Sequence, residues 1–282
     1  MGKNNFQALQ YARAQLGRPY WYGTFGQIGD QKLLDEKRRQ YPSQYPPQKW
    51  TEESFTSQFG QKVHDCIGLA VKGYLMSENP EAPAKYIAKY DVSANGMIEL
   101  CQIQGDISSM PDVPGVLVWK PGHIGIYEGW NKGKKVVIED KGHAYGVVRT
   151  TNTPWQKWGL CPWWTYITIK TWVTSLYSDV LGRNPDKGGL EWWCDQLHDR
   201  TKSPTDVIKY FLTSPEFKNR NLSNAAFLAV LYQVFFDRAP DRDGYAYWMS
   251  QLESGKTREY VINGFLGSQE WKDMSAYLEY II

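Results

Sequence analysis

The chain has 282 residues, of which 42% are apolar and 22% charged, and its formal net charge is +2. This length accommodates one large domain or two ordinary ones, and the composition is that of a folded protein. The nearly balanced charge, without a long block of Lys or Arg, argues against a nucleic-acid partner. No apolar run is long enough to cross a bilayer, so we expect no membrane insertion.

The four cysteines, at positions 66, 101, 161 and 194, fit neither a CxxC pair nor a zinc-ligand spacing. We therefore expect no disulfide framework, no metal site and a reduced compartment of origin. The first ten residues, MGKNNFQALQ, lack the apolar core of a secretory signal. We accordingly expect synthesis in the cytoplasm without a signal peptide.

Two helices are predicted in the first part of the chain. Residues 6–16 carry apolar side chains at helical spacing and stop before Gly17. Residues 27–60 are polar and read as an insertion or long surface loop with one helix at 31–40. DCIGLAVKGYLM, residues 65–76, predicts a second helix with Asp65 at its N-cap.

Short strands follow these helices. GVLVW at 115–119, HIGIYEG at 123–129 and KVVIED at 135–140 predict three strands, and GVVRT at 146–150 predicts a fourth. Helices followed by a meander of strands indicate an α+β domain, which we place over residues 1–168.

The last part of the chain contains an internal duplication. LYSDVLGRNPDKGGLEWWCDQL, from Leu176, aligns with LYQVFFDRAPDRDGYAYWMSQL, from Leu231, at an offset of 55 residues. Helical spacing of the apolar residues in both copies predicts a few helices per repeat, packed together because one repeat alone cannot bury its apolar face. We therefore expect an all-α domain built from two repeats over residues 172–282.

Cys66 has two interpretations. Free cysteines are most often small buried hydrophobes, which makes a structural role the default. A cysteine at the start of a helix is, however, placed for activation, because the free N–H groups and the dipole lower the pKa of the thiol. The same helix start can offer the Cys66 N–H to an oxyanion.

A cysteine nucleophile also needs a base, and His123 is the candidate. Along its predicted strand His123 lies opposite the face of Ile124 and Ile126, and the next strand brings Glu139 to its level in a hairpin. A carboxylate there would orient the imidazole and favour its protonated form. The alternative leaves His123 as a surface strand residue and Glu139 as a solvated charge.

Three motifs resemble the NlpC-type cell-wall cysteine peptidases, which are papain-like hydrolases of bacterial peptidoglycan. The motifs are GRPYWYG at 17–23, HDCIGL at 64–69 and PGHIGIYEG at 121–129. The resemblance covers about residues 5–168 and implies a papain-like fold for this part. It also implies three catalytic residues: Cys66 as nucleophile, His123 as general base and Glu139 as the third polar residue.

The same resemblance assigns substrate contacts and a reaction. Tyr20 matches a tyrosine that lines the family's cleft, and Asp65 belongs to the box that carries Cys66. Thr24 stands where the family has a second glycine, and a long insertion follows it. The implied reaction is cleavage of a stem-peptide amide after D-γ-glutamate, without metal or organic cofactor.

The parts together look like a phage endolysin, which acts on the bacterial cell wall after release by lysis. Two alternatives remain open. The same fold could cleave the amide between muramic acid and L-alanine, or a non-wall substrate, and the protein could instead be a non-catalytic wall-binding protein with a vestigial cleft. A virion-associated lysin or an injected toxin would have the same parts.

The C-terminal repeats resemble a family catalogued as domain of unknown function 4214. Residues 181–197 match its L-G-R-x-P-D-x-x-G-L pattern closely, and residues 236–252 match it less well. In this arrangement the resemblance suggests binding to peptidoglycan or a cell-wall glycopolymer. Asp241 and Asp243 hint at calcium, but the segment lacks the glutamate of an EF-hand loop, so we expect no metal.

Overall fold

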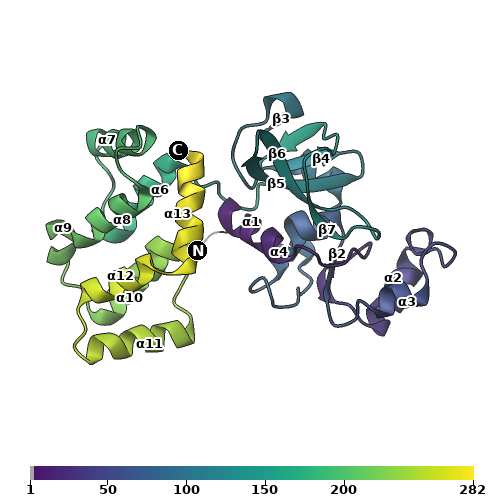
Figure 1. Cartoon of the computed structure of the whole chain (residues 1–282), viewed down its shortest axis with the longest axis horizontal. Coiled ribbons are helices and arrows are strands. Elements are labelled where there is room, and N and C mark those ends of the chain that lie inside the picture. The colour runs from purple at the N-terminus through teal and green to yellow at the C-terminus, as the bar shows by residue number, and fades with distance from the viewer. Residues whose placement is uncertain (1–2) are drawn as a thin grey trace. The chain divides into compact units, whose positions relative to one another are not determined.

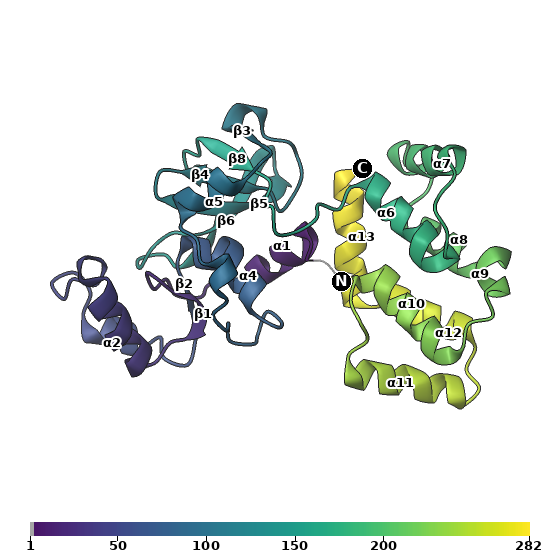
Figure 2. The same cartoon turned by 180° about the vertical axis from the view of Figure 1, so that it is seen from behind.

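The computed structural model describes residues 3–282, the side chain of residue 280 excepted, and divides the chain into two compact units (Figures 1 and 2). One unit ends at Tyr166, and the other covers Ile167–Ile282. The first contains both β-sheets, and the second is helical throughout. The predicted succession of a mixed α/β part and a helical part is therefore confirmed.

The first unit is built on a six-stranded antiparallel sheet with the strand order β3-β8-β4-β5-β6-β7. Its strands are β3 (Gln104–Asp106), β4 (Leu117–Lys120), β5 (His123–Asn131), β6 (Lys134–Asp140), β7 (Val147–Thr150) and β8 (Lys157–Gly159). The sequence predicted the four strands from β4 to β7. It missed β3 and β8, which are three residues long and too short to show an alternation.

One face of this sheet is covered by helices. Leu117, Ile124, Ile126 and Ile138 belong to an apolar cluster that these helices complete. The helices are α1 (Asn5–Ala14), the π-helical turn η2 (Gly68–Lys72), α4 (Gly73–Met76) and α5 (Ala94–Leu100). The predicted helices at 6–16 and 65–76 are thus confirmed, whereas α5 was not predicted.

The opposite face of the sheet has its own apolar cluster. Val118, Tyr127 and Val137 alternate with the residues of the helix-covered face and pack there with Trp158. Two short turns, η3 (Ala88–Tyr90) and η4 (Ile107–Ser109), lie in the connecting loops of this unit.

The insertion is folded rather than a bare loop. Strands β1 (Phe25–Ile28) and β2 (Lys62–His64) pair antiparallel at its base. Between them lie α2 (Gln31–Gln40), η1 (Pro42–Gln44) and α3 (Glu52–Thr56). A small apolar core holds these elements together; its buried members are Trp21, Leu34, Tyr45, Phe55 and Val63.

The second unit consists of two successive sets of helices. The first set is α6 (Ile169–Ser175), η5 (Leu176–Leu181), α7 (Lys187–His198), α8 (Pro204–Thr213) and α9 (Pro215–Asn219). The second set is α10 (Asn224–Phe236), α11 (Arg242–Glu253), α12 (Arg258–Leu266) and α13 (Gln269–Ile281). Each sequence repeat therefore forms one helical set, as the duplication predicted.

Within the described residues, no helix combines the length and the apolar character that a bilayer span requires.

Candidate active site

Cys66 lies in the first turn of the helical stretch 66–76, and Asp65 caps that turn. The Asp65 carboxylate accepts hydrogen bonds from the backbone N–H of Gly68 at 2.7 Å and of Gly23 at 3.0 Å. Gly68 has to be a glycine because a Cβ there would overlap the carbonyl oxygen of Thr24. The cap thus fixes the helix start against the loop that precedes β1.

The sulfur of Cys66 is placed at the beginning of β5. Its Sγ lies 4.0 Å from the carbonyl oxygen of Gly122, the residue directly before His123. The Cys66 side chain is buried, with 9% of the residue exposed. The nucleophile candidate therefore lies at the end of β5 where the base candidate, His123, begins the strand.

His123 is held by a carboxylate and by an aromatic ring. Its Nε2 lies 2.6 Å from Oε2 of Glu139, and the Trp155 ring stacks on the imidazole at a centroid distance of 5.4 Å. Because an ionised carboxylate only accepts hydrogen bonds, Nε2 carries the hydrogen and Nδ1 keeps its lone pair. Nδ1 is thus the nitrogen that can take a proton from sulfur.

Glu139 is fully buried and held by further donors. The hydroxyl groups of Thr150 and Thr153 also donate hydrogen bonds to its carboxylate. Burial by itself would raise the pKa of Glu139, but the hydrogen bonds from His123, Thr150 and Thr153 outweigh it and lower that pKa. Glu139 is therefore ionised at neutral pH and can stabilise a protonated imidazole.

The thiol of Cys66 differs from the expectation. Burial is the main cause that raises its pKa, and the charge of Asp65 adds to the effect. The backbone N–H groups of Ile124 and Ile67 lower the pKa by less than these causes raise it. The resting group is accordingly a neutral thiol, and a helix start alone does not make it a thiolate.

The other three histidines have different surroundings. His64 is fully buried, bonded to the Tyr11 hydroxyl at 2.9 Å, and burial lowers its pKa to about 3. His143 packs among aromatic rings, and His198 belongs to the helical unit. Among the four, His123 is the one that directly follows Gly122, the residue whose carbonyl the Cys66 sulfur contacts.

An open cleft of about 730 Å³ leads to Cys66. Asp65, Cys66 and Gly122 line it, together with part of α2 and the segment 91–95. The cleft is wide enough for a peptide-sized ligand. One wall belongs to the insertion, which the family pattern lacks.

Tyr20 lies beside this cleft rather than in its lining. It borders a neighbouring cavity of about 370 Å³. Burial raises the pKa of its hydroxyl, and the nearby Asp65 and Cys66 raise it further. Of the five predicted residues, Asp65 and Cys66 line the cleft, and His123, which follows the cleft residue Gly122, pairs with Glu139. Tyr20 borders the second cavity instead.

The insertion is anchored by His143. The imidazole packs against the rings of Tyr20, Tyr45, Trp50 and Phe55, with centroid distances of 5.0, 5.6, 4.8 and 5.4 Å. Burial lowers the pKa of His143 to about 4, so the ring is neutral at physiological pH. This contact fixes the insertion to the loop that follows β6.

Asp140 is a site neighbour that the sequence reading missed. Both carboxylate oxygens are buried and find no hydrogen-bond partner among the described residues. Burial raises its pKa well above the usual range, and the charges of Asp65 and Glu139 raise it further. Asp140 is therefore a neutral acid on the strand face opposite to that of Glu139.

Thr150, Thr153 and Trp155 were also missed. Thr150 ends a predicted strand, but its contact with Glu139 depends on the pairing of β6 with β7. Trp155 is one of 13 tryptophans and carries no local signal that separates it from core residues.

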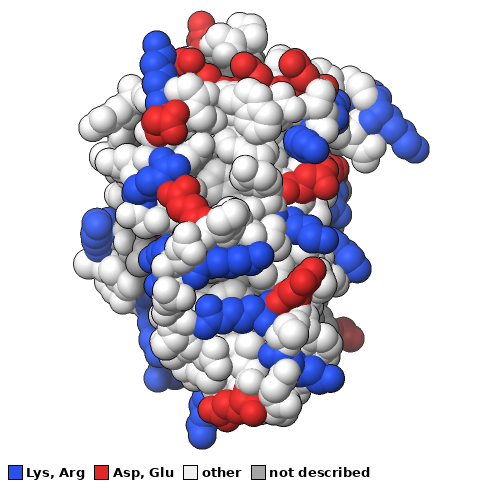
Figure 3. Space-filling view, turned by 90° about the vertical axis from the view of Figure 1, so that its left-hand side faces the viewer, with Lys and Arg blue, Asp and Glu red and all other residues white. Residues whose placement is uncertain are grey.

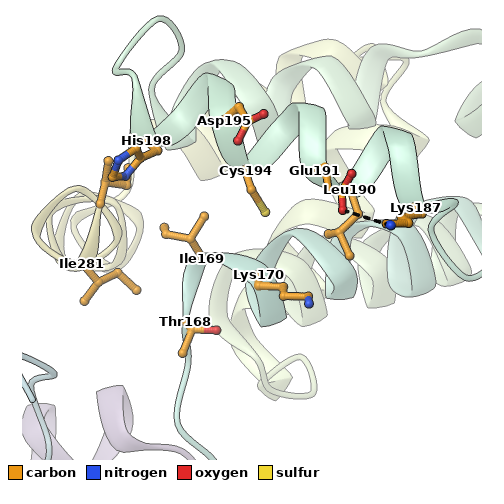
Figure 4. Close-up of a pocket in the computed structure, with 11 residues that line it drawn as sticks. Thr168, Ile169, Lys170, Lys187, Leu190, Glu191, Cys194, Asp195, His198 and Ile281 are labelled. Atoms are coloured by element: carbon orange, nitrogen blue, oxygen red, sulfur yellow. Dashed lines mark ion pairs between the residues drawn. The ribbon is translucent and has the colours of Figure 1, made fainter.

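A second cysteine and histidine border a cavity in the helical unit. Figure 4 shows Cys194 and Ile169 directed into this cavity of about 700 Å³, with His198 at its edge near Ile281. Partial burial raises the pKa of Cys194, and the charge of Asp195 adds to the effect. His198 and Cys194 sit on one helix face, and among the described residues no hydrogen bond or ion pair joins His198 to a carboxylate as His123 is joined to Glu139.

The repeat signature is explained by the packing within each repeat. Asp186 and Asp241 cap α7 and α11 by accepting the N–H of Gly189 and Gly244, each at 2.8 Å. A Cβ at either glycine would overlap a tyrosine hydroxyl, that of Tyr177 or of Tyr232.

The arginines of the signature have equivalent partners as well. Arg183 pairs with Glu216, and Arg238 pairs with Glu270. Arg238 also forms an ion pair with Asp241 at 3.0 Å. Asp241 is one of the two aspartates that the sequence suggested as calcium ligands. Asp241 thus has structural partners in Arg238 and in the N–H of Gly244.

Two overlapping stretches, residues 165–221 and 208–275, match the family model described as "Domain of unknown function (DUF4214)". They cover both helical sets and support the predicted duplication. No curated protein and no solved structure matches the chain.

Proposed function

We propose that the protein is a peptidoglycan hydrolase whose first unit is an NlpC-type, papain-like cysteine peptidase. The observation that supports this most is the pairing of His123 with the buried Glu139 beside Cys66, at the end of an open cleft. Such an arrangement of thiol, imidazole and orienting carboxylate is what nucleophilic catalysis by cysteine requires.

The reaction would begin with proton transfer from the Cys66 thiol to Nδ1 of His123. The sulfur attacks the carbonyl carbon of the scissile amide, and the negative charge moves to the carbonyl oxygen. The Cys66 N–H, in the first turn of its helix, is a donor for that oxyanion. Collapse breaks the C–N bond, and the amine leaves with the proton from His123.

Water then completes the turnover. His123 takes a proton from a water molecule while the water oxygen attacks the carbonyl carbon of the thioester. The C–S bond then breaks, the acid product leaves, and the protonated His123 returns the proton to sulfur to restore the thiol. Because the resting thiol is neutral, formation of the thiolate depends on His123 and on the ionised Glu139 behind it.

For the substrate we propose the stem peptide, cut after D-γ-glutamate. The insertion forms one wall of the cleft, and its Tyr41 packs on Gly23, whose N–H holds the Asp65 cap. The insertion is therefore a wall of the cleft that a substrate has to pass. Members of the peptidase family without this insertion lack that wall.

The test uses a defined tripeptide, L-Ala-γ-D-Glu followed by a diamino acid, and a muramoyl peptide as second substrate. Mass spectrometry should find the dipeptide and the free diamino acid. Release of an intact peptide with a free N-terminal alanine from the muramoyl substrate would instead establish the amidase alternative.

The raised pKa of Cys66 favours a second candidate, a wall-binding protein without catalysis. This candidate predicts no cleavage of either peptide at any pH from 6 to 9, together with retained binding to walls. We propose that the helical repeats bind the wall in both cases, at the bacterial surface where a phage endolysin acts.

A further inference from the structure

The DUF4214 signature leaves one feature of each repeat unexplained. As described above, its Asp residues cap helices and its Arg residues form ion pairs. Its Gly residues leave room for the Tyr hydroxyl groups. In contrast, Trp192 on α7 and Tyr247 on α11 occupy equivalent positions in the two repeats and are 51% and 52% exposed. About half of the surface of each residue thus lies outside the packing of its repeat.

Each exposed ring is backed by an anchored tryptophan. Trp192 lies against Trp193 at a centroid distance of 4.6 Å, and Tyr247 lies against Trp248 at 4.8 Å. Trp193 in turn packs on Phe211 at 5.5 Å, within the core of its repeat. Trp248 packs on Phe265 at 5.4 Å in the same way. The backing fixes the exposed rings and reduces the entropy lost when a ligand stacks on them.

The first repeat presents a second exposed ring. Tyr210 is 60% exposed and lies 4.8 Å from Trp193. The equivalent residue of the second repeat is Gly264, and a Cβ there would overlap the ring of Trp248. The first repeat therefore has two rings around its anchor, and the second has one.

The charge distribution indicates the kind of ligand. Figure 3 shows one face of the protein on which acidic and basic side chains are interspersed, with uncharged surface between them. Helices α7 and α11 also bear both signs, with Lys187, Glu191 and Asp195 on α7 and Arg242, Asp243 and Glu253 on α11, so neither helix offers a field of one sign to attract a polyanion. Flat aromatic rings with an apolar body and a polar edge suit the apolar faces of sugar rings.

We propose that Trp192 with Tyr210, and Tyr247 in the second repeat, are stacking surfaces for the pyranose rings of a wall glycan. This inference rests on the proposed wall binding and names its residues and ligand class. Equivalent surfaces on both repeats match a polymer that repeats its own units. Two weak sites on one chain then give a higher overall affinity through avidity.

Binding is measured with the full chain carrying Cys66→Ala, so that the ligand is not cleaved. The probes are insoluble peptidoglycan stripped of anionic glycopolymers, by co-sedimentation, and soluble N-acetylglucosamine oligomers, by tryptophan fluorescence. Trp192→Ala and Tyr247→Ala should each weaken binding about 3- to 10-fold, because an aromatic contact contributes about 0.5–1.5 kcal/mol. The double variant should lose more than either.

Two controls separate stacking from a general effect on the fold. Tyr260→Ala removes a ring of somewhat lower exposure (44%) from α12 and should leave binding unchanged. Trp192→Phe and Tyr247→Phe keep a ring and should restore most of the affinity. All variants should keep the thermal midpoint of the parent within about 2 °C.

Two results would overturn the inference. In the first, the double Ala variant binds stripped walls as tightly as the parent. In the second, binding requires anionic glycopolymers on the wall, which makes the ligand a polyanion. Hydrolysis by the protein with intact Cys66 is measured separately, so a failed peptidase proposal and a failed stacking proposal give different results.

Discussion

Replacement of Glu139 by Gln tests the site at the group that holds the base. Gln is similar in shape and can still accept hydrogen bonds from Thr150 and Thr153 through its carbonyl oxygen. Its amide group, however, would face Nε2 of His123 as a donor. The imidazole then takes the tautomer with hydrogen on Nδ1, which cannot accept the Cys66 proton.

The magnitude follows from the geometry. The hydrogen bond between His123 and Glu139 measures 2.6 Å, involves a charged partner and is partly buried. Hydrogen bonds to charged groups contribute about 1.5–3 kcal/mol, and each 1.36 kcal/mol corresponds to a factor of ten in rate. Glu139→Gln should therefore lower kcat about 10- to 150-fold and leave KM nearly unchanged.

The assay is the initial rate of fragment release from peptidoglycan, with Glu128→Gln as the matched control. Glu128 lies on β5 and pairs with Arg13 and Arg149. Its replacement should cost stability but leave kcat within about twofold, since these ion pairs do not contact the site. A Glu139→Gln enzyme with more than half of the wild-type kcat would refute the assignment of Glu139.

The same variant has a signature in the stability profile. The native state lowers the pKa of Glu139, so its ionised form stabilises the fold above the unfolded value of about 4.3. That contribution is lost as the pH falls through the lowered native pKa. Urea unfolding between pH 5 and 3 should show a shallower loss of stability for Glu139→Gln than for wild type.

Three further predictions concern residues around the site. Asp140→Asn should raise the thermal midpoint at pH 7, because the raised native pKa means that folding at this pH has to protonate the Asp140 carboxylate, whereas an Asn amide needs no proton. Because the native pKa of Asp140 is raised, the wild type loses stability as the pH rises above about 4, and the stability gained by Asp140→Asn should shrink in acid. A lower thermal midpoint for Asp140→Asn than for wild type at pH 7 would contradict this. Gly68→Ala should lower the free energy of unfolding in urea by about 1–3 kcal/mol, because the new Cβ would overlap the carbonyl oxygen of Thr24. Gly188→Ala is the control: there is space for its Cβ, so it should be neutral or stabilising. His143→Ala should speed trypsin cleavage within residues 27–60 and lower kcat/KM, because it removes the imidazole that packs against Trp50 of the insertion. An unchanged cleavage pattern would show that this aromatic packing does not anchor the insertion.

Local patterns predicted the elements that carry the site. The alternation in residues 123–129 and 135–140 marked β5 and β6, and the short turn between them predicted the hairpin that brings Glu139 to His123. Asp65 followed by an apolar helical stretch marked the start of the Cys66 helix. Both signals lie within a few residues of the groups they position.

What the sequence could not show depends on contacts between distant segments. Thr153 and Trp155 reach Glu139 and His123 only because β6 and β7 pair. The neutral state of the Cys66 thiol results from its burial under several elements, which a helix start does not reveal. The sequence predicts the helix at 31–40 but not the small core of the insertion, because the core residues, such as Leu34 and Phe55, are far apart in the chain.

The most direct test of the proposed hydrolase compares wild type and Cys66→Ala on purified peptidoglycan, with turbidity for the rate and mass spectrometry for the products. We predict that wild type releases fragments with new termini after D-γ-glutamate and that Cys66→Ala releases none while still binding the wall. A Cys66→Ala protein as active as wild type would show that Cys66 is not the nucleophile. Walls of several chemotypes left intact by the wild type would contradict the hydrolase itself.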